Sequence, residues 1–152
     1  THLREFHRVL EQTFHEDLAM GATVSASSTH SLGFSASNLV DGNPETCWAA
    51  NKAATKTIIE FVFPNNITFN IFQAQETIAL GQRVRAWKLE AQSSDGTWLP
   101  VTAGTTIGYK RITRFAPCKT QHIRFYLDNC FASPVLTSFS LFYNPDLPKR
   151  AG

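Results

Sequence analysis

The fold of this 152-residue chain is decided by residues 38–48, which read NLVDGNPETCW. Gly42 and Pro44 both favour turn geometry, so this segment can continue neither a helix nor a strand. Four oxygen-bearing side chains fall within six residues of the loop: Asp41, Asn43, Glu45 and Thr46. Hard cations such as calcium bind roughly six to eight oxygens at about 2.4 Å. The segment therefore predicts a calcium site, a turn that places Trp48 in the core, or both.

The length and composition of the chain fit one globular domain that is large enough to bury a core. Its 12 phenylalanines and 17% charged residues argue against disorder. No apolar run is long enough to cross a bilayer, and the sequence does not open with a signal peptide. Because Thr1 is not a natural initiator, we expect a piece of a longer protein.

Positive charge gathers in the middle of the chain, although the net charge is only +2. Residues 83–124 hold eight basic and two acidic side chains, whereas residues 1–82 hold four basic and eight acidic ones. A basic segment can face an anionic glycan, a lipid headgroup or nucleic acid, or can alternate along solvent-facing strands. The sequence contains no recognised nucleic-acid-binding motif, so we expect no such partner.

The cysteines and one sequon bear on the compartment. Cys118 and Cys130 flank one predicted strand and would lie about 40 Å apart if extended, which is too far for a disulfide. Cys47 is then the expected partner in any disulfide. Asn66 begins the glycosylation sequon Asn-Ile-Thr. Together these features favour a secreted, extracellular protein or one in a lysosome- or vacuole-type compartment.

Hydrophobic periodicity predicts one helix followed by an all-β body. Apolar residues recur at helical spacing at Leu3, Phe6, Leu10, Phe14 and Leu18. This pattern predicts an amphipathic helix over 3–18 that ends before Gly21. The apolar period then changes to two, which is typical of half-buried strands. The predicted strands are 23–27, 57–63, 67–74, 84–92, 97–101, 111–115, 121–127 and 137–143, with a hairpin turn at SSDGTW, residues 93–98.

These elements predict a single antiparallel β-sandwich of jelly-roll type with about eight strands. The expected organisation is a connecting helix from a missing upstream domain at 1–20, the sandwich at 21–145, and a tail at 146–152. The apolar face of the helix would then rest on the preceding domain.

The sequence offers no complete catalytic pattern. Glycoside hydrolysis needs two carboxylates held across the scissile bond, and nothing pairs the loop carboxylates. The segment 33–37 lacks the closing glycine of a nucleophile elbow. The histidines and cysteines lack the usual spacing of zinc ligands. We therefore expect no active site in this chain.

Carbohydrate binding is the better-supported chemistry. Sugars are recognised by aromatic faces together with a few fixed polar groups in a shallow site. Candidate residues in the predicted loops are His30, Phe34, Glu76, Arg83, Tyr109 and Arg111. Two of them, Glu76 and Arg83, can equally pair with each other across a loop. Tyr109 and Arg111 can equally belong to a turn and a solvated strand start, and we expect Trp87 in the core and Trp98 at the hairpin.

Residues 38–48 resemble the signature of discoidin domains (coagulation factor type C), which include family 32 carbohydrate-binding modules. The resemblance extends from Ala22 to Tyr143 and covers the 93–98 hairpin. The segments FHEDLA (14–19), QETIALGQRV (75–84) and GTTIGYKR (104–111) are similar to the carboxy-terminal discoidin domain of family 29 α-L-fucosidases, particularly the plant and bacterial forms. In those retaining enzymes a separate barrel carries the carboxylate nucleophile. The resemblance implies a non-catalytic accessory domain.

The resemblance also bears on ligands. It implies calcium held by Asp41, Asn43 and Thr46 with backbone oxygens near Asn38. Ser138 stands where such domains usually supply a ligating glutamate, so one strong ligand is missing. Galactose-binding members tend to carry a histidine after the tryptophan and an arginine in the middle loop, where this chain has Ala49 and Glu76. A galactose-type pocket is therefore not expected.

The expected function is that of a carbohydrate-binding or structural accessory domain of an α-L-fucosidase that releases terminal fucose from glycans. Its expected partners are fucosylated oligosaccharides and the catalytic domain of the parent enzyme. The alternative is a free-standing adhesion or phospholipid-binding discoidin domain. That alternative requires apolar side chains at the loop tips, for which residues 32–34 are the candidate.

Overall fold

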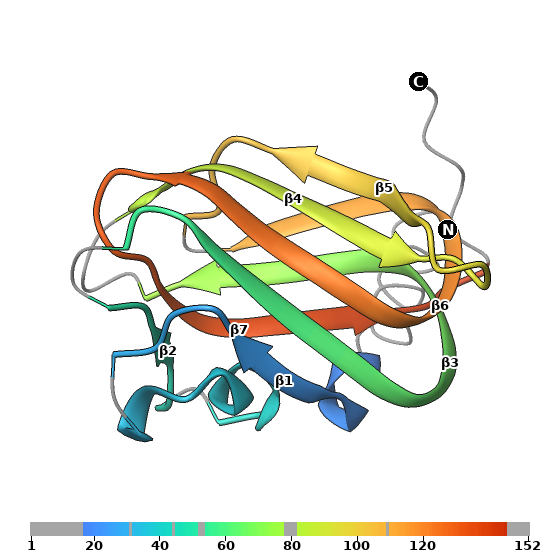
Figure 1. The fold of residues 1–152 in the computed structure, drawn as a ribbon, viewed down its shortest axis with the longest axis horizontal. Helices are drawn as coiled ribbons and strands as arrows, with labels where there is room; N and C mark the ends of the chain where they lie inside the picture. The colour runs from blue at the N-terminus through green and yellow to red at the C-terminus, as the bar shows by residue number, and fades with distance from the viewer. Residues whose placement is uncertain are drawn as a thin grey trace, which may run out of the picture.

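A computed structural model of the chain describes residues 17–30, 32–43, 45–51, 54–77, 82–108 and 110–145. Figure 1 shows a β-sandwich with short 3-10 helices on one side. The 3-10 helices in this part of the chain are η1 (Leu18–Gly21), η2 (Leu32–Phe34) and η3 (Ala36–Val40). The strands are β1 (Thr23–Ala26), β2 (Trp48–Ala49), β3 (Thr57–Glu76), β4 (Val84–Gln92), β5 (Trp98–Gly104), β6 (Arg111–Cys130) and β7 (Val135–Phe142).

The predicted all-β antiparallel fold is confirmed, and its two layers share their longest strands. The first half of β3 pairs with β1 and with the second half of β6, which in turn pairs with β4, while β5 pairs with β4 at the edge. The second half of β3 pairs with β7 and with the first half of β6, and β2 pairs with β7. Both 20-residue strands bend from one layer into the other (Figure 1).

The bends explain where the strand prediction was wrong. Segments 57–63 and 67–74 form one strand, and so do 111–115 and 121–127, which leaves six of the predicted strands; with β2 the described chain has seven. Pro64, Asn65 and Asn66 are exposed at the register shift between Val62 and Ile67. Proline and asparagine favour turns, but here they form an irregular stretch within a continuous strand. The two-residue strand β2 was not predicted.

Aromatic side chains from both layers meet in the core. The ring of Phe72, on β3, lies with its centroid 5.1 Å from Trp87, 5.3 Å from Phe125 and 5.2 Å from Phe139. Trp87 and Phe125 belong to one layer, whereas Phe72 and Phe139 belong to the other. Each large side chain contributes about 1.5–3 kcal/mol by leaving water. The expected core position of Trp87 is confirmed, and Trp48 is also buried, with its indole N–H donating to the Ser28 carbonyl.

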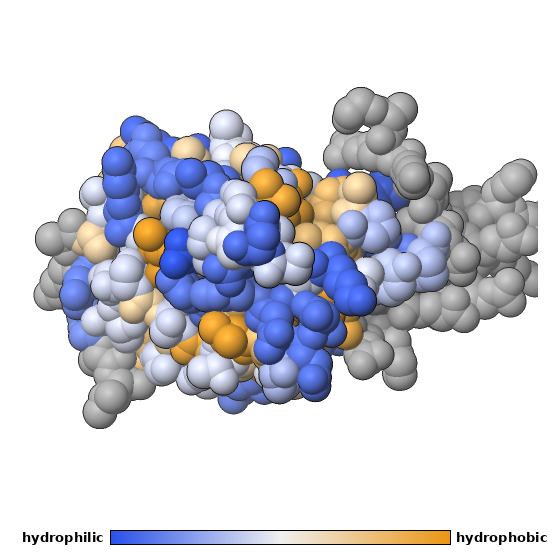
Figure 2. Space-filling model, turned by 45° about the vertical axis from the view of Figure 1, so that its right-hand side comes forward, coloured by the Kyte–Doolittle hydropathy of each residue, from blue (hydrophilic) through white to orange (hydrophobic). Residues whose placement is uncertain are grey.

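The outer surface carries no broad apolar patch on the side shown in Figure 2, where small orange areas are separated by hydrophilic ones. The larger apolar side chains that stay exposed within the described ranges include Ile58, Val62 and Leu99, on β3 and β5. Isolated apolar side chains of this kind are normal on a protein surface. No described helix is both long enough and apolar enough to cross a membrane.

The hairpin between β4 and β5 forms as predicted. The Ser93 N–H donates to the Thr97 carbonyl at 2.8 Å, and Gly96 adopts a φ of 89°, which favours glycine. Hydrogen bonds from the Ser93 hydroxyl and the Thr97 N–H lower the pKa of Asp95 to about 2. Trp98 follows the turn, and the guanidinium of Arg124 lies 4.1 Å from its ring centroid.

The start of the described chain differs from the predicted helix over 3–18, of which residues 3–16 lie outside the described residues. Asp17 has extended backbone angles, φ −88° and ψ 106°, and is the N-cap of the 3-10 helix η1. The predicted α-helix therefore does not continue through Asp17 to Leu18. One carboxylate oxygen of Asp17 accepts from the Ala19 N–H at 2.9 Å and from the Leu141 N–H at 3.0 Å. The carboxylate thus caps η1 and attaches it to β7. The predicted tail at 146–152 also lies outside the described residues.

The cysteines and the sequon are all in described segments. Cys47, Cys118 and Cys130 are free, so the pairing considered for Cys47 does not occur. Asn66 is exposed at the bend of β3.

Candidate functional site

Several loops are tied together at one end of the sandwich, on the left of Figure 1. The His30 N–H donates to the Ala49 carbonyl, the Ala50 N–H to Pro134, and the Thr77 N–H to Val135. The Phe131 N–H donates to the Arg83 carbonyl at 2.6 Å, and the Glu76 N–H to Gly108 at 2.9 Å. This end of the sandwich is referred to below as the loop end; its described residues are 28–30, 48–51, 76–77, 82–85, 105–108, 110–111 and 128–135.

Glu76 holds three parts of the loop end in place. Its side chain is only 2% exposed. One carboxylate oxygen accepts from the backbone N–H groups of Arg83, at 2.7 Å, and Val84, at 3.0 Å. The other accepts from the Gly108 N–H at 2.8 Å. Charge-assisted bonds of this kind offset the cost of burying a carboxylate. Glu76 therefore acts from inside the protein to order the loops around it.

Arg83 lies beside Glu76, as one sequence reading expected, but the contact uses its backbone. Its guanidinium instead donates to the Ser133 carbonyl at 2.8 Å. Within the described ranges, the ion pairs are those of Glu60 with His122 and with Arg124, so none joins Glu76 to Arg83. The 82–84 segment is thereby fixed to the β6–β7 loop.

Of the other predicted sugar contacts, His30 and Arg111 belong to the loop end, whereas Phe34 lies on η2. His30 and Phe34 contact each other edge to face, with ring centroids 5.6 Å apart, and Phe34 is 37% exposed. Arg111 is the first residue of β6, and its guanidinium carbon lies 5.9 Å from the Trp87 ring centroid. The Arg111 Nε is buried without a hydrogen-bond partner. Tyr109 lies outside the described residues.

Phe131 is a prominent feature of the loop end that the sequence reasoning missed. Its side chain is 70% exposed, and the guanidinium carbon of Arg85 lies 4.7 Å from its ring centroid. A phenylalanine directly after the strand residue Cys130 gives no sign of exposure by itself. The nearby turn signal of Ser133-Pro134 was the available clue that the strand had ended.

The loop of residues 41–46 brings oxygens of Asp41, Asn43 and Thr46 together. The Thr46 hydroxyl donates to an Asp41 carboxylate oxygen at 2.6 Å and lies 3.0 Å from the Asn43 carbonyl oxygen. The other Asp41 oxygen accepts from the Asn43 N–H at 2.9 Å. The Asn38 side-chain amide donates to the carbonyls of Gly33 and Cys47 and so holds the two flanks of the loop.

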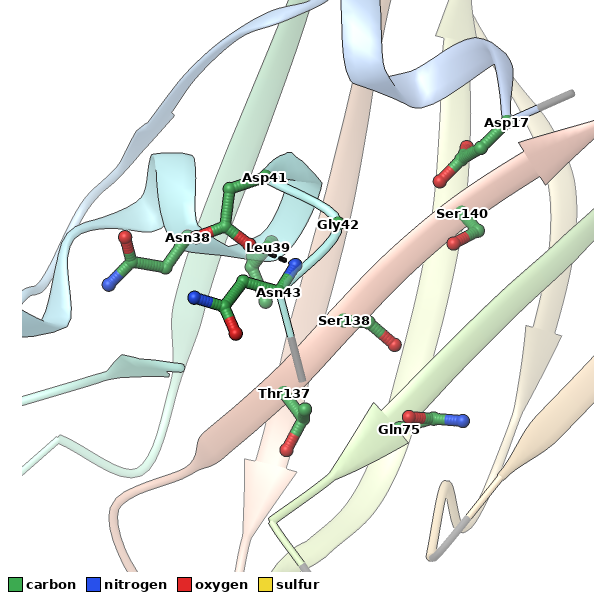
Figure 3. A pocket seen from close by; sticks show the side chains of 10 residues that line it. All are labelled: Asp17, Asn38, Leu39, Asp41, Gly42, Asn43, Gln75, Thr137, Ser138 and Ser140. Carbon is green, nitrogen blue, oxygen red and sulfur yellow. Dashed lines mark hydrogen bonds between the residues drawn. The ribbon is translucent and has the colours of Figure 1, made fainter. Parts of the chain in front are cut away.

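A cavity of about 170 Å³, lined mostly by polar residues, separates this loop from β7 (Figure 3). Asp41 and Asn43 line one side of it, and Gln75, Ser138 and Ser140 line the other. Ser138 therefore does lie across from the loop, where the family resemblance placed a missing ligand. Asp41 is the carboxylate on the loop side of the cavity, and no cluster of three His, Cys, Asp or Glu side chains suited to a metal occurs in the described residues.

Asp17 lines the same cavity from η1. Burial raises the pKa of its carboxyl, and hydrogen bonds from the Leu141 N–H, the Ser140 hydroxyl and the Ala19 N–H offset only part of that effect.

Comparison with known proteins settles the family. Residues 23–136 match the F5/8 type C domain. This chain belongs to the F5/8 type C, or discoidin, family. It is 32% identical over 144 residues to "Putative alpha-L-fucosidase 1" of Oryza sativa subsp. japonica, covering 92% of this chain and 28% of that protein. It is 27% identical to "Alpha-L-fucosidase 1" of Arabidopsis thaliana, covering 92% of this chain and 29% of that protein. The chain thus spans less than a third of these curated relatives.

Solved structures agree with this assignment. SpGH29 superposes with a TM-score of 0.88 at 34% identity, over 94% of this chain and 31% of that one. A putative α-L-fucosidase from Bacteroides thetaiotaomicron gives a TM-score of 0.87 at 27% identity, over 90% and 30%. Chitosan-binding module 1 from Paenibacillus sp. IK-5 shares the fold, with a TM-score of 0.74 at 22% identity, over 84% and 99%. The resemblance to the discoidin domain of α-L-fucosidases is confirmed.

Proposed function

We propose that this chain is a non-catalytic accessory domain of an α-L-fucosidase and that its loop end captures glycans. The observation that carries the proposal is the similarity over 92% of the chain to α-L-fucosidases that are more than three times as long. The remaining length of such a protein is ample for a separate catalytic domain. The activity of the parent, including its retaining mechanism, belongs to this proposal.

The loop end suits glycan capture because its loops are held rigid while several side chains stay accessible. The buried Glu76 carboxylate fixes residues 83, 84 and 108, so little ordering is needed on binding. Phe131 offers an exposed ring, and the guanidinium of Arg85 lies beside it. An aromatic face and fixed donors on a rigid scaffold are the elements that sugar recognition uses.

Calorimetric titration of the chain with fucosylated oligosaccharides tests this function. We expect saturable binding that is lost in Phe131→Ala and kept in Val62→Ala, which shortens an exposed side chain on β3 away from the loop end. Absence of heat with every sugar would contradict glycan capture. The accessory role would then be structural, and removing the domain from its parent would lower the melting temperature of the catalytic domain without changing its KM.

The exposed ring of Phe131 beside Arg85 is also what a phospholipid-binding domain would display, so this alternative needs its own test. Sedimentation with vesicles that contain phosphatidylserine separates the two functions. We expect the chain to stay in the supernatant. Co-sedimentation that Phe131→Ala abolishes would favour the lipid-binding alternative.

We also propose a weak structural calcium held by Asp41, Asn43 and Thr46. The converging oxygens of these residues support it, but a single carboxylate implies a dissociation constant of about 1 mM. At about 10 mM calcium the melting temperature should then rise by about 4 °C over that in EDTA. Ser138→Glu adds a carboxylate to β7, across the cavity from Asp41, and should enlarge the shift. An unchanged melting temperature for both proteins would contradict the site.

We infer a secreted parent protein from the sequon at Asn66. The side chain is exposed, as are Pro64 and Asn65 before it, so a glycan would meet no buried surface. Expression through a secretory host should give a protein whose electrophoretic mobility changes after enzymatic deglycosylation. Equal mobility of the wild type and Asn66→Gln would contradict this inference.

A further inference from the structure

We propose that the loop end selects glycans that carry negative charge, as sulfate esters or uronic-acid carboxylates, through Arg83, Arg85 and Arg111. This inference rests on the proposed glycan capture and names the class of glycan. Phe131 supplies the apolar platform in this arrangement, and the arginines supply the charge-selective contacts.

The arginines of the loop end are not neutralised by ion pairs within the described ranges. Both ion pairs of the described residues are made by Glu60, which lies on β3 and bonds His122 and Arg124 at 2.9 and 3.1 Å. Neither includes an arginine of the loop end. Lys110 is exposed next to Arg111 and adds a fourth positive charge.

The loop end also holds two carboxylates, and neither forms an ion pair with these cations in the described residues. Glu76 is buried, and its two oxygens already accept from three backbone N–H groups. Asp128, on β6, forms no ion pair in the described part of the chain. Four cationic side chains therefore face two carboxylates at the loop end, and the excess positive charge attracts anions.

Arg111 carries a buried donor with no acceptor. Its Nε is shielded from solvent and unpaired, while the Trp87 ring lies 5.9 Å from the guanidinium carbon. An unpaired buried N–H is unfavourable, so such a group calls for an oxygen from a ligand or from water. Sulfate and carboxylate groups offer two coplanar oxygens that match the fork of a guanidinium.

Arg85 and Phe131 form an exposed part of the loop end. The guanidinium carbon of Arg85 lies 4.7 Å from the ring centroid of Phe131, and the Phe131 side chain remains 70% exposed. The backbone of Phe131 donates to Arg83, and the Arg83 side chain donates to Ser133. These bonds fix the backbone of Phe131 and the side chain of Arg83 relative to each other, which reduces the entropy lost on binding.

The site lies away from the point where the described chain begins. Asp17 bonds Leu141 near the far end of β7, whereas Val135 at the other end of that strand belongs to the loop end. Six residues of extended strand separate the two, roughly 20 Å. Figure 1 shows η1 and the loop end on opposite sides of the sandwich.

Calorimetry with three probes tests the inference: a sulfated fucose tetrasaccharide, its desulfated counterpart, and trigalacturonic acid. We expect the charged probes to bind at least about tenfold more tightly than the desulfated one, and this preference should shrink between about 50 and 500 mM NaCl. Arg85→Gln and Arg111→Gln should each weaken binding of the charged probes by about tenfold, whereas Arg85→Lys should restore part of it. Arg114→Gln is the matched control, because Arg114 is exposed on β6 outside the loop end.

The outcomes separate this inference from the function on which it rests. Equal, salt-independent binding of all three probes would overturn charge selection and leave glycan capture standing. Failure of every probe would overturn both. Binding to phosphatidylserine vesicles that Arg85→Gln abolishes, without oligosaccharide binding, would assign the arginines to a lipid headgroup and overturn the inference. Since Arg85 is exposed, its variants test the site even if Arg111→Gln does not fold.

Discussion

Glu76 shows how one side chain can organise a binding surface without reaching it. Its carboxylate receives three backbone N–H groups from residues 83, 84 and 108, which belong to two different loops. Each bond is charge-assisted, and together they replace the water that the carboxylate would otherwise keep. The side chain therefore determines where Arg83 stands and how the β5–β6 loop approaches it.

Glu76→Gln should destabilise the chain by about 2–4 kcal/mol, because the amide nitrogen that replaces one oxygen would face backbone donors. Urea unfolding followed by tryptophan fluorescence measures the loss. Glu90→Gln, on a partly exposed side chain of β4, is the control and should change stability by less than about 0.5 kcal/mol. Equal effects of the two substitutions would contradict the role given to Glu76.

Asp17→Asn should remove a dependence of stability on pH. The folded-state pKa of Asp17 is raised mainly by burial, so its contribution to stability is full below the unfolded pKa of 3.8 and is lost as pH rises through the folded value. The asparagine oxygen can still accept from Ala19 and Leu141, which share one oxygen in the wild type. The variant should therefore gain stability relative to the wild type as pH rises.

Unfolding in urea at several pH values between about 3 and 7 checks this trend. Asp95→Asn provides the opposite trend as a control, since the pKa of Asp95 is lowered to about 2 and its contribution is lost as pH falls. A constant difference between Asp17→Asn and the wild type across this range would contradict the expectation.

At the level of the elements, β4 and β5 meet where Trp87 needs a residue without a side chain. Gly104 pairs with Trp87, and a Cβ atom built on it would lie 2.6 Å from Cζ2 of the indole. The indole N–H is fixed by a bond to the Thr106 carbonyl at 3.2 Å, so the ring cannot move aside freely. The end of β5 is thus matched to the core tryptophan of β4.

Gly104→Ala should cost about 1–3 kcal/mol, because the added methyl group overpacks a buried aromatic ring. Thermal unfolding with circular dichroism would measure the change. Gly21→Ala is the matched control, since a Cβ at Gly21 meets no atom within 4 Å. If the two variants had the same melting temperature, the close approach to Trp87 would not limit stability.

The elements that the sequence predicted well are those with local signals. Residues 87–91 alternate strictly, the predicted strand 84–92 coincides with β4, and the SSDGTW turn follows directly. By contrast, the breaks predicted at 64–66 and 116–120 lie within strands that actually continue, because the bend between two layers depends on long-range pairing. The candidate site divides in the same way. That Glu76 and Arg83 meet across a loop was one of two alternatives from the sequence, whereas the exposure of Phe131 depends on how the β6–β7 loop meets β4.

On the scale of the whole molecule, neither layer of the sandwich can form without the other. The strands β3 and β6 belong to both layers, and Phe72 contacts aromatic rings from both. Separating the layers would therefore break continuous strands and expose the core at once. Such an arrangement favours cooperative unfolding of the described domain.

Urea transitions followed by tryptophan fluorescence and by far-ultraviolet circular dichroism should therefore coincide. Trp48 lies on β2, which pairs with β7 in one layer, and Trp87 lies on β4 in the other layer. The fluorescence therefore reports on both layers. Phe139→Ala should shift both transitions together, since it removes a ring in contact with Phe61 and Phe72. Two separate transitions would contradict a shared core.

The continuity of β3 and β6 also has a consequence for how the chain is made. Thr57 pairs with Leu127, so these partners are about 70 residues apart in sequence, and such distant pairing slows folding towards milliseconds or seconds. A ribosome that adds about 5–20 residues per second needs roughly 3–10 s to extend the chain from the end of β3 to the end of β6. During that interval the apolar residues of β3 have only β1 beside them. The nascent chain therefore depends on protection of this one strand until β6 emerges.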